Sequence, residues 1–228
     1  MLPSNPLYQF TKCGPFKYVP KNQRKIVDQI IDNNKISSYV ETLLRNPVLR
    51  YHPSINTIMS QVKKGCVYLS EELEKAYELN IFNSLKKDLE EHNNDIQTWS
   101  KHYKIDNPKK LPTFNKIVDL MAKKFNVQVV ETRLNYYPDE LSWKPYHQDR
   151  HSTYDNTITE NFTMGASFGA ERALSFKHIE TDITFDIPQK NGDIFAFDAN
   201  VNKLFMHGVP KISHLSQPRF SIIAWGKK

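Results

Sequence analysis

The residues most able to do chemistry gather in the segment KPYHQDRHSTYDN, which spans positions 144–156 of this 228-residue chain. His147 and Asp149 are two residues apart there, and the side chains at i and i+2 of an extended segment point to the same face. An imidazole and a carboxylate on one face can share one metal ion. A third ligand must come from elsewhere. His207, in FMHGVPK near the end of an expected late strand, is the best candidate.

Two histidines and one carboxylate on one side of an ion leave its other positions open, which is the ligand pattern of non-haem Fe(II) oxygenases. Zinc can occupy the same three ligands, as it does in hydrolases. The His-x-Asp pair alone is a weak signal, because a chain with eight histidines forms such pairs by chance. His178 and Glu180 are a second pair of this kind. The identity of the metal therefore depends on the residues that would bind a cosubstrate.

Three further residues could bind a dicarboxylate beside the metal. Arg219 follows His207 by 12 residues and begins the last expected strand. Its guanidinium can bind a carboxylate through two parallel hydrogen bonds. Asn135 and Tyr137 alternate along the strand before the His-x-Asp pair, so they share a face and could donate to the same ligand. The ordered set of these residues is much less probable by chance than any one of them.

The elements that must position these residues differ between the two halves of the chain. After Asn126, short segments rich in β-branched and aromatic residues alternate with turn residues, which is typical of strands. They are expected at 127–137, 161–169, 173–179, 182–187, 192–199, 203–209 and 219–225. No long helix separates them, which favours an antiparallel sandwich or barrel over a parallel sheet.

The first half is mostly helical in pattern. Apolar residues at helical spacing predict helices, with one break near Asn80 or Asn83. These helices are expected at 23–34, 37–45, 69–92 and 111–125, and connectors are expected at 46–59 and 101–112. We therefore predict an α+β protein with two parts. Residues 1–110 form a mostly helical region, a candidate for substrate recognition, and residues 111–228 form the catalytic core.

Charge separates the same two halves. Residues 1–126 hold 20 Lys and Arg against 13 Asp and Glu, a net charge of +7, whereas residues 127–228 hold 11 against 12, a net charge of −1. A basic half can attract a polyanion such as nucleic acid, although a lysine-rich solvated surface explains it equally well.

Composition bounds where the protein works. The sequence contains no run of about 18 apolar residues, so no membrane span is predicted, and no secretory signal is visible. Cys13 and Cys66 do not suggest a disulfide framework. We expect a monomer in the cytoplasm or nucleus.

Four blocks of the sequence, in order, resemble the AlkB-like Fe(II)/2-oxoglutarate-dependent dioxygenases. They cover roughly residues 111–228 and read LPTFNKIVDLMAKKFN, LNYYPDELSWKPYHQD, MGASFGAERALSFKH and NGDIFAFDANVNKLFMHGVPK. The resemblance implies a double-stranded β-helix, or jelly roll, as the catalytic core. It also implies Fe(II) as the metal, and 2-oxoglutarate and O2 as cosubstrates.

The resemblance also assigns roles to residues. It implies that His147, Asp149 and His207 bind iron and that Asn135, Tyr137 and Arg219 bind 2-oxoglutarate. A further set, predicted to shape or line the substrate pocket, is Trp143, Tyr146, His151 and Arg172. Two positions depart from the family. Trp225 stands where a second arginine is usual, six residues after Arg219, and His151 replaces an acidic residue.

Three functions fit these observations. The leading one is oxidative demethylation or hydroxylation of a nucleic acid base, which aromatic residues such as Trp143, Tyr146 and Tyr154 could stack on. The second is hydroxylation of a protein side chain or a small molecule by the same centre. The third is a binding protein that keeps the fold without turnover.

Overall fold

The computed structural model describes residues 54–69, 72–73, 81–92, 95–99, 101–151, 153–154, 157–158, 160–214 and 216–228. The helices expected at 23–34 and 37–45 lie outside these residues. Within the described part of the chain, no helix is long and apolar enough to cross a membrane.

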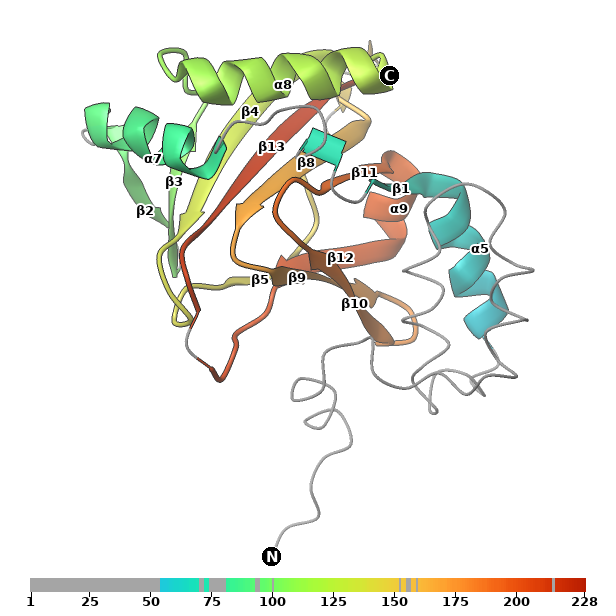
Figure 1. Cartoon of the computed structure of the whole chain (residues 1–228). Coiled ribbons are helices and arrows are strands. Elements are labelled where there is room, and N and C mark those ends of the chain that lie inside the picture. The colour runs from blue at the N-terminus through green and yellow to red at the C-terminus, as the bar shows by residue number, and fades with distance from the viewer. Residues whose placement is uncertain are drawn as a thin grey trace, which may run out of the picture.

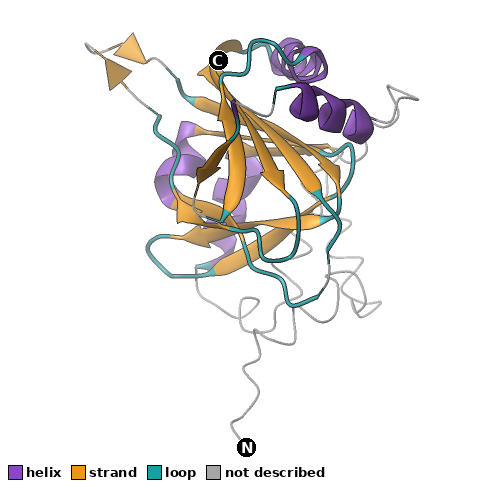
Figure 2. Cartoon of the chain, turned by 90° about the vertical axis from the view of Figure 1, so that its left-hand side faces the viewer, coloured by secondary structure: helices purple, strands orange, loops and turns teal. Residues whose placement is uncertain are grey.

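Two antiparallel sheets face each other and form a sandwich, which is seen from two sides in Figures 1 and 2. The large sheet contains, in spatial order, β1 (Cys66–Leu69), β11 (Ile194–Asp198), β8 (Phe162–Gly169), β13 (Arg219–Lys227), β4 (Gln128–Tyr137), β3 (His102–Asp106) and β2 (Gln97–Trp99). The small sheet contains β10 (Thr184–Gln189), β9 (Arg172–His178), β12 (Phe205–Val209) and β5 (Lys144–His147). The short strands β6 (Thr153–Tyr154) and β7 (Thr157–Ile158) pair with each other. This arrangement confirms the predicted jelly roll.

Two helices cover the outer face of the large sheet, the face turned away from the small sheet (Figure 1). They are α7 (Ile81–Glu91) and α8 (Pro112–Phe125). The predicted apolar face of α8 is buried against the sheet; it consists of Phe114, Ile117, Val118, Met121 and Phe125. The helix ends where Asn126 adopts a left-handed conformation with φ of 54°, which turns the chain into β4.

Strand β13 shows how the large sheet separates core from pocket. Phe220, Ile222 and Ala224 belong to the apolar cluster that also contains the buried face of α8. The residues between them point to the space between the sheets, because side chains alternate along a strand. These pocket-facing residues are Arg219, Ser221, Ile223 and Trp225.

A second apolar cluster fills the other end of the sandwich. It joins β9, β10, β11 and β12 to the helix α5 (Ile55–Gly65) and to the short helix α9 (Ala199–Leu204). Phe176 is its centre, with ring centroids 5.6 Å from Phe185 and 5.7 Å from Phe197. This packing fixes β12, and hence His207, relative to the large sheet.

Three predictions of helices and connectors in the first half are wrong in part. The connector predicted at 101–112 contains β3, in which Lys104 and Asp106 lie opposite Asn135 and Arg133 of β4. The connector at 46–59 includes the first turn of α5, and Leu69 of the helix predicted at 69–92 belongs to β1. Strands β1, β2 and β3 all join the large sheet, so the predicted division at residue 110 does not coincide with an edge of that sheet.

Candidate metal and cosubstrate site

His147, Asp149 and His207 come together at the edge of the small sheet, where β5 pairs with β12. His147 on β5 lies directly opposite His207 on β12, and Asp149 follows β5 by two residues. The Nε2 atoms of His147 and His207 lie 3.6 Å and 3.5 Å from Asp149 Oδ1. The three ligand atoms are all within 4.8 Å of one another. One ion can therefore contact all three residues without rearrangement of the backbone.

The ring of His147 is held in the tautomer that binds a metal through Nε2. Its Nδ1 lies 2.9 Å from the carbonyl oxygen of Pro145, which can only accept, so Nδ1 carries the proton. Nε2 then carries a lone pair, is buried and has no hydrogen-bond partner among the described residues. Burial lowers the pKa of His147, which keeps the ring neutral. A neutral imidazole with a bare nitrogen facing a carboxylate fits a divalent cation.

Asp149 is fixed from several directions. Its Oδ2 accepts a hydrogen bond of 2.9 Å from Thr163 Oγ1. Its backbone N–H and C=O are both bound by the side-chain amide of Asn202 on α9, each at 2.8 Å. Burial by itself would raise the pKa of Asp149, but the closeness of His207 and then of His147 holds it well below its usual range. The carboxylate is ionised and correctly turned before any metal arrives.

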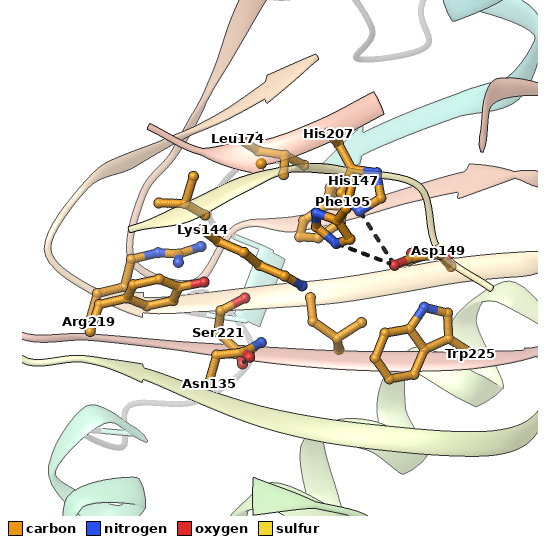
Figure 3. Close-up of a pocket in the computed structure, with 15 residues that line it drawn as sticks. Asn135, Lys144, His147, Asp149, Leu174, Phe195, His207, Arg219, Ser221 and Trp225 are labelled. Atoms are coloured by element: carbon orange, nitrogen blue, oxygen red, sulfur yellow. Dashed lines mark hydrogen bonds and ion pairs between the residues drawn. The ribbon is translucent and has the colours of Figure 1, made fainter. Parts of the chain in front are cut away.

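A pocket between the two sheets begins at these ligands and extends to Arg219 (Figure 3). Arg219 is buried, and its Nε donates a hydrogen bond of 2.9 Å to Ser167 Oγ. Burial lowers its pKa to about 10, so it still carries its charge at neutral pH. Its Nη1 is buried without a hydrogen-bond partner in the described structure. A buried cationic donor without a partner is costly, and a carboxylate in the pocket would satisfy it.

Asn135 and Tyr137 both line this pocket, as their alternation predicts. Tyr137 lies directly opposite Arg219 across β4 and β13, with the guanidinium 5.2 Å from the ring centroid. The amide of Asn135 is already engaged: Oδ1 lies 3.2 Å from His102 Nε2, and Nδ2 donates to Ser221 O at 3.4 Å. His102 in turn stacks on Tyr137. These contacts hold both residues in place around the ligand space.

The four residues predicted for a substrate pocket do not line this one. Arg172 is buried and donates hydrogen bonds to the backbone oxygens of Ser142 and Pro210 at 2.8 Å and 2.9 Å. It therefore ties together the loops before β5 and after β12. His151 lies 2.9 Å from Thr163 Oγ1, so it supports the contact between Thr163 and Asp149.

The other two lie nearer the surface. Trp143 is partly buried, and the ammonium of Lys211 is 4.8 Å from its ring centroid. Tyr146 is 39% exposed, and its hydroxyl makes a hydrogen bond of 2.7 Å with Ser175 Oγ. Their contact with a substrate stays a prediction. The side chain of Tyr154 lies outside the described part of the structure.

Sequence reasoning missed four residues of the site, namely Lys144, Thr163, Ser167 and Asn202. Ser167 and Thr163 sit on β8, and their alternation along one face of that strand was visible in the sequence. Asn202 follows a capping residue, Asp198, whose side chain accepts a hydrogen bond from Val201 N and starts α9. The sequence pattern gave none of these residues a role, because each acts only through a partner brought near by folding.

Comparison with known proteins agrees with this fold. No protein-family model and no curated protein matches the sequence. Among solved structures, OsALKBH1 is similar with a TM-score of 0.55 and 13% identity, over 72% of this chain and 97% of that chain. A Pseudomonas putida prolyl-4-hydroxylase gives 0.52 and 11%, over 74% and 96%. The non-haem α-ketoglutarate-dependent epimerase SnoN from nogalamycin biosynthesis gives 0.56 and 12%, over 74% and 80%.

The chain thus has the fold of the Fe(II)/2-oxoglutarate-dependent oxygenases. Two of the three similar structures carry hydroxylase or α-ketoglutarate-dependent chemistry in their names, and the third, OsALKBH1, is by its name an AlkB homologue. At 11–13% identity this likeness concerns the fold. The function must be argued from the residues in the pocket.

Proposed function

We propose that this protein is an Fe(II)/2-oxoglutarate-dependent dioxygenase of AlkB-like type. His147, Asp149 and His207 hold the iron, and Arg219, Asn135 and Tyr137 bind 2-oxoglutarate. The observation that carries the proposal is the pairing of two features in one pocket: three ligand atoms within 4.8 Å of one another, and a buried arginine whose Nη1 has no partner among the described residues. Zinc could bind to the same ligands, but a hydrolytic site does not require a buried arginine that binds a dicarboxylate.

Iron bound here supplies the redox chemistry that couples oxidation of 2-oxoglutarate to succinate and CO2 with insertion of oxygen from O2 into a C–H bond. The protein contributes charge and position. One carboxylate and two neutral imidazoles leave a divalent ion with net positive charge, which favours an anionic cosubstrate. Arg219 orients the far end of that cosubstrate. Apolar walls formed by Leu174, Phe195 and Ile223 limit access of water to the pocket.

We propose a nucleic acid base as the substrate. The likeness to OsALKBH1 and the net charge of +7 on residues 1–126 support this class. So does the exposed ring of Trp99 on β2, which is 39% exposed and has the cationic groups of Lys104 and Arg133 within 5.1 Å of its centroid. An aromatic face among cations suits a base and its phosphates. The likeness to the prolyl-4-hydroxylase and SnoN favours the alternative, hydroxylation of a protein side chain or a small molecule.

Succinate formation from 2-oxoglutarate with Fe(II) tests the proposal. It should be measured alone and with methylated single- and double-stranded DNA and RNA. Turnover that rises with one oligonucleotide supports both enzyme class and substrate. Turnover unaffected by every oligonucleotide supports the alternative substrates.

The variant His147→Ala should lose all turnover, whereas His214→Ala, a change at an exposed histidine, should retain it. Absence of turnover in metal-loaded protein under every condition would favour the binding-protein hypothesis. The salt dependence of oligonucleotide binding gives a separate measure of phosphate contacts.

A further inference from the structure

Lys144 is a buried cation in the pocket that none of the roles above uses. Its side chain is part of the pocket lining, and the residue is only 8% exposed. In the described part of the structure its ammonium makes no hydrogen bond and no ion pair; it lies 5.1 Å from the centroid of the Trp99 ring, and the carboxylates of Asp149 and Asp106 attract it from beyond ion-pair distance. A largely buried lysine without a directly bound anion is costly. An anion bound to its ammonium in the pocket would reduce this cost.

The backbone places Lys144 beside the metal ligands through an irregularity in β5. Lys144 pairs with Val209, and His147 pairs with His207, so three residue steps on β5 match two on β12. The extra residue reverses the alternation of side chains, and Lys144 and His147 therefore both face the pocket. Gly208 permits the close approach of the two strands here, because a Cβ at that position would lie 2.7 Å from Lys144 O.

Lys144 and Arg219 are the two lysine or arginine residues among those that line the described pocket. In Figure 3 the Lys144 side chain runs across the pocket between the end that holds Arg219 and the end that holds Asp149. Trp225, six residues after Arg219 on the same face of β13, offers only a neutral N–H, which is buried and has no hydrogen-bond partner among the described residues. A dicarboxylate brings two negative charges, and Arg219 accounts for one of them.

We propose that Lys144 is the second cationic group of the cosubstrate site and binds the carboxylate next to the keto group, while Arg219 binds the distal carboxylate. The inference rests on the proposed function and deepens it. Trp225 on β13 carries no positive charge, and Lys144 on β5 of the opposite sheet supplies that charge instead. Cosubstrate binding then clamps the two sheets together, since β5 and β13 each contribute one charge.

Calorimetric titration of protein loaded with Mn(II) tests this without turnover. The two ligands are 2-oxoglutarate and 2-oxopentanoate, which has a methyl group in place of the distal carboxylate. Lys144→Met should lower the affinity for both ligands by the same factor, about tenfold or more, because both ligands retain the carboxylate next to the keto group. Arg219→Met should lower only the affinity for 2-oxoglutarate, so that the protein no longer prefers 2-oxoglutarate to 2-oxopentanoate. Lys144→Arg should restore most of the affinity.

Lys104→Met is the matched control. The Lys104 ammonium is also 5.1 Å from the centroid of the Trp99 ring, but it pairs with Asp106 and does not line the pocket. The Lys104→Met protein should bind both ligands with the affinity of the wild type. Should Lys144→Met not fold, Lys144→Gln serves for the same comparison.

Three results overturn the inference. Equal affinities of Lys144→Met and Lys104→Met for both ligands would show that Lys144 has no part in binding. Loss of 2-oxoglutarate affinity alone would move Lys144 to the distal carboxylate. Loss of Mn(II) affinity in Lys144→Met would make it a support of the metal ligands instead. A wild-type protein that binds Mn(II) but neither ligand would instead overturn the proposed function itself, and the inference with it.

Discussion

The hydroxyl of Thr163 donates a hydrogen bond of 2.9 Å to Oδ2 of Asp149, and in doing so connects the large sheet to the metal site. Both histidines of the proposed metal site are on the small sheet, whereas Thr163 is on β8 of the large one. Asp149 therefore depends on the spacing of the two sheets. Hydrogen bonds that orient a metal ligand commonly change metal affinity by 10- to 100-fold when removed.

Thr163→Val should accordingly weaken metal binding by about tenfold or more, since the isosteric methyl keeps the packing but cannot donate to Asp149. Titration with Mn(II) measures the effect. Thr184→Val on β10, away from the site, is the control and should bind the metal normally. Equal affinities for Thr163→Val and the wild type would show that Asn202 alone suffices to hold Asp149.

Ser167→Ala should raise the KM for 2-oxoglutarate several-fold and leave kcat nearly unchanged. Ser167 Oγ accepts from Arg219 Nε at 2.9 Å, so its loss leaves a buried N–H unpaired and frees the guanidinium to turn. Steady-state kinetics with saturating iron separate the two constants. The exposed Ser213→Ala should match the wild type. A fall in kcat without a change in KM would contradict this role.

His102 should make the metal-free protein less stable in acid. Burial first, and then the charge of Lys144, lower the pKa of His102 to about 4. Between its unfolded pKa of about 6.5 and this value, the unfolded chain binds a proton that the native protein refuses. The free energy of unfolding therefore falls as the pH drops through that window, by about 2 to 3 kcal/mol for this group.

Urea denaturation of the wild type and of His102→Gln at pH 7 and pH 4 checks this expectation. His147 and His151 also have pKa values lowered by burial and titrate in the same direction, so only the difference between the two proteins reports on His102. His102→Gln should lose less stability than the wild type on going to pH 4. Parallel losses in the two proteins would contradict the effect.

Asn126 should tolerate glycine better than alanine. Its φ of 54° is in the left-handed region, where a Cβ costs roughly 1 kcal/mol and where asparagine and glycine are favoured. Asn126→Ala should lower the free energy of unfolding by about 1 kcal/mol, and Asn126→Gly should be close to neutral. Chemical denaturation measures both. A larger loss for glycine than for alanine would count against the turn being the cause.

Much of the site could be predicted from local pattern. Asn135 and Tyr137 alternate along one strand, and His147 and Asp149 are close in sequence, so their shared surroundings follow from chain geometry. His207 and Arg219 could be added because the late strands are strongly apolar and easily recognised. The structure places all six in one pocket. The strand β3 was missed because one of its faces is polar: His102 contacts Asn135, and Asp106 pairs with Lys104 and Arg133.

The sequence by itself determined which residue types form the proposed metal site and the order of the strands that carry them, because alternation and spacing along the chain encode both. Only the tertiary structure decided the partners of those residues. The irregularity in β5 brings Lys144 into the pocket, and the contact between sheets brings Thr163 to Asp149. Neither appears in a motif, since a shift of register and a distance across two sheets depend on how the whole sandwich packs.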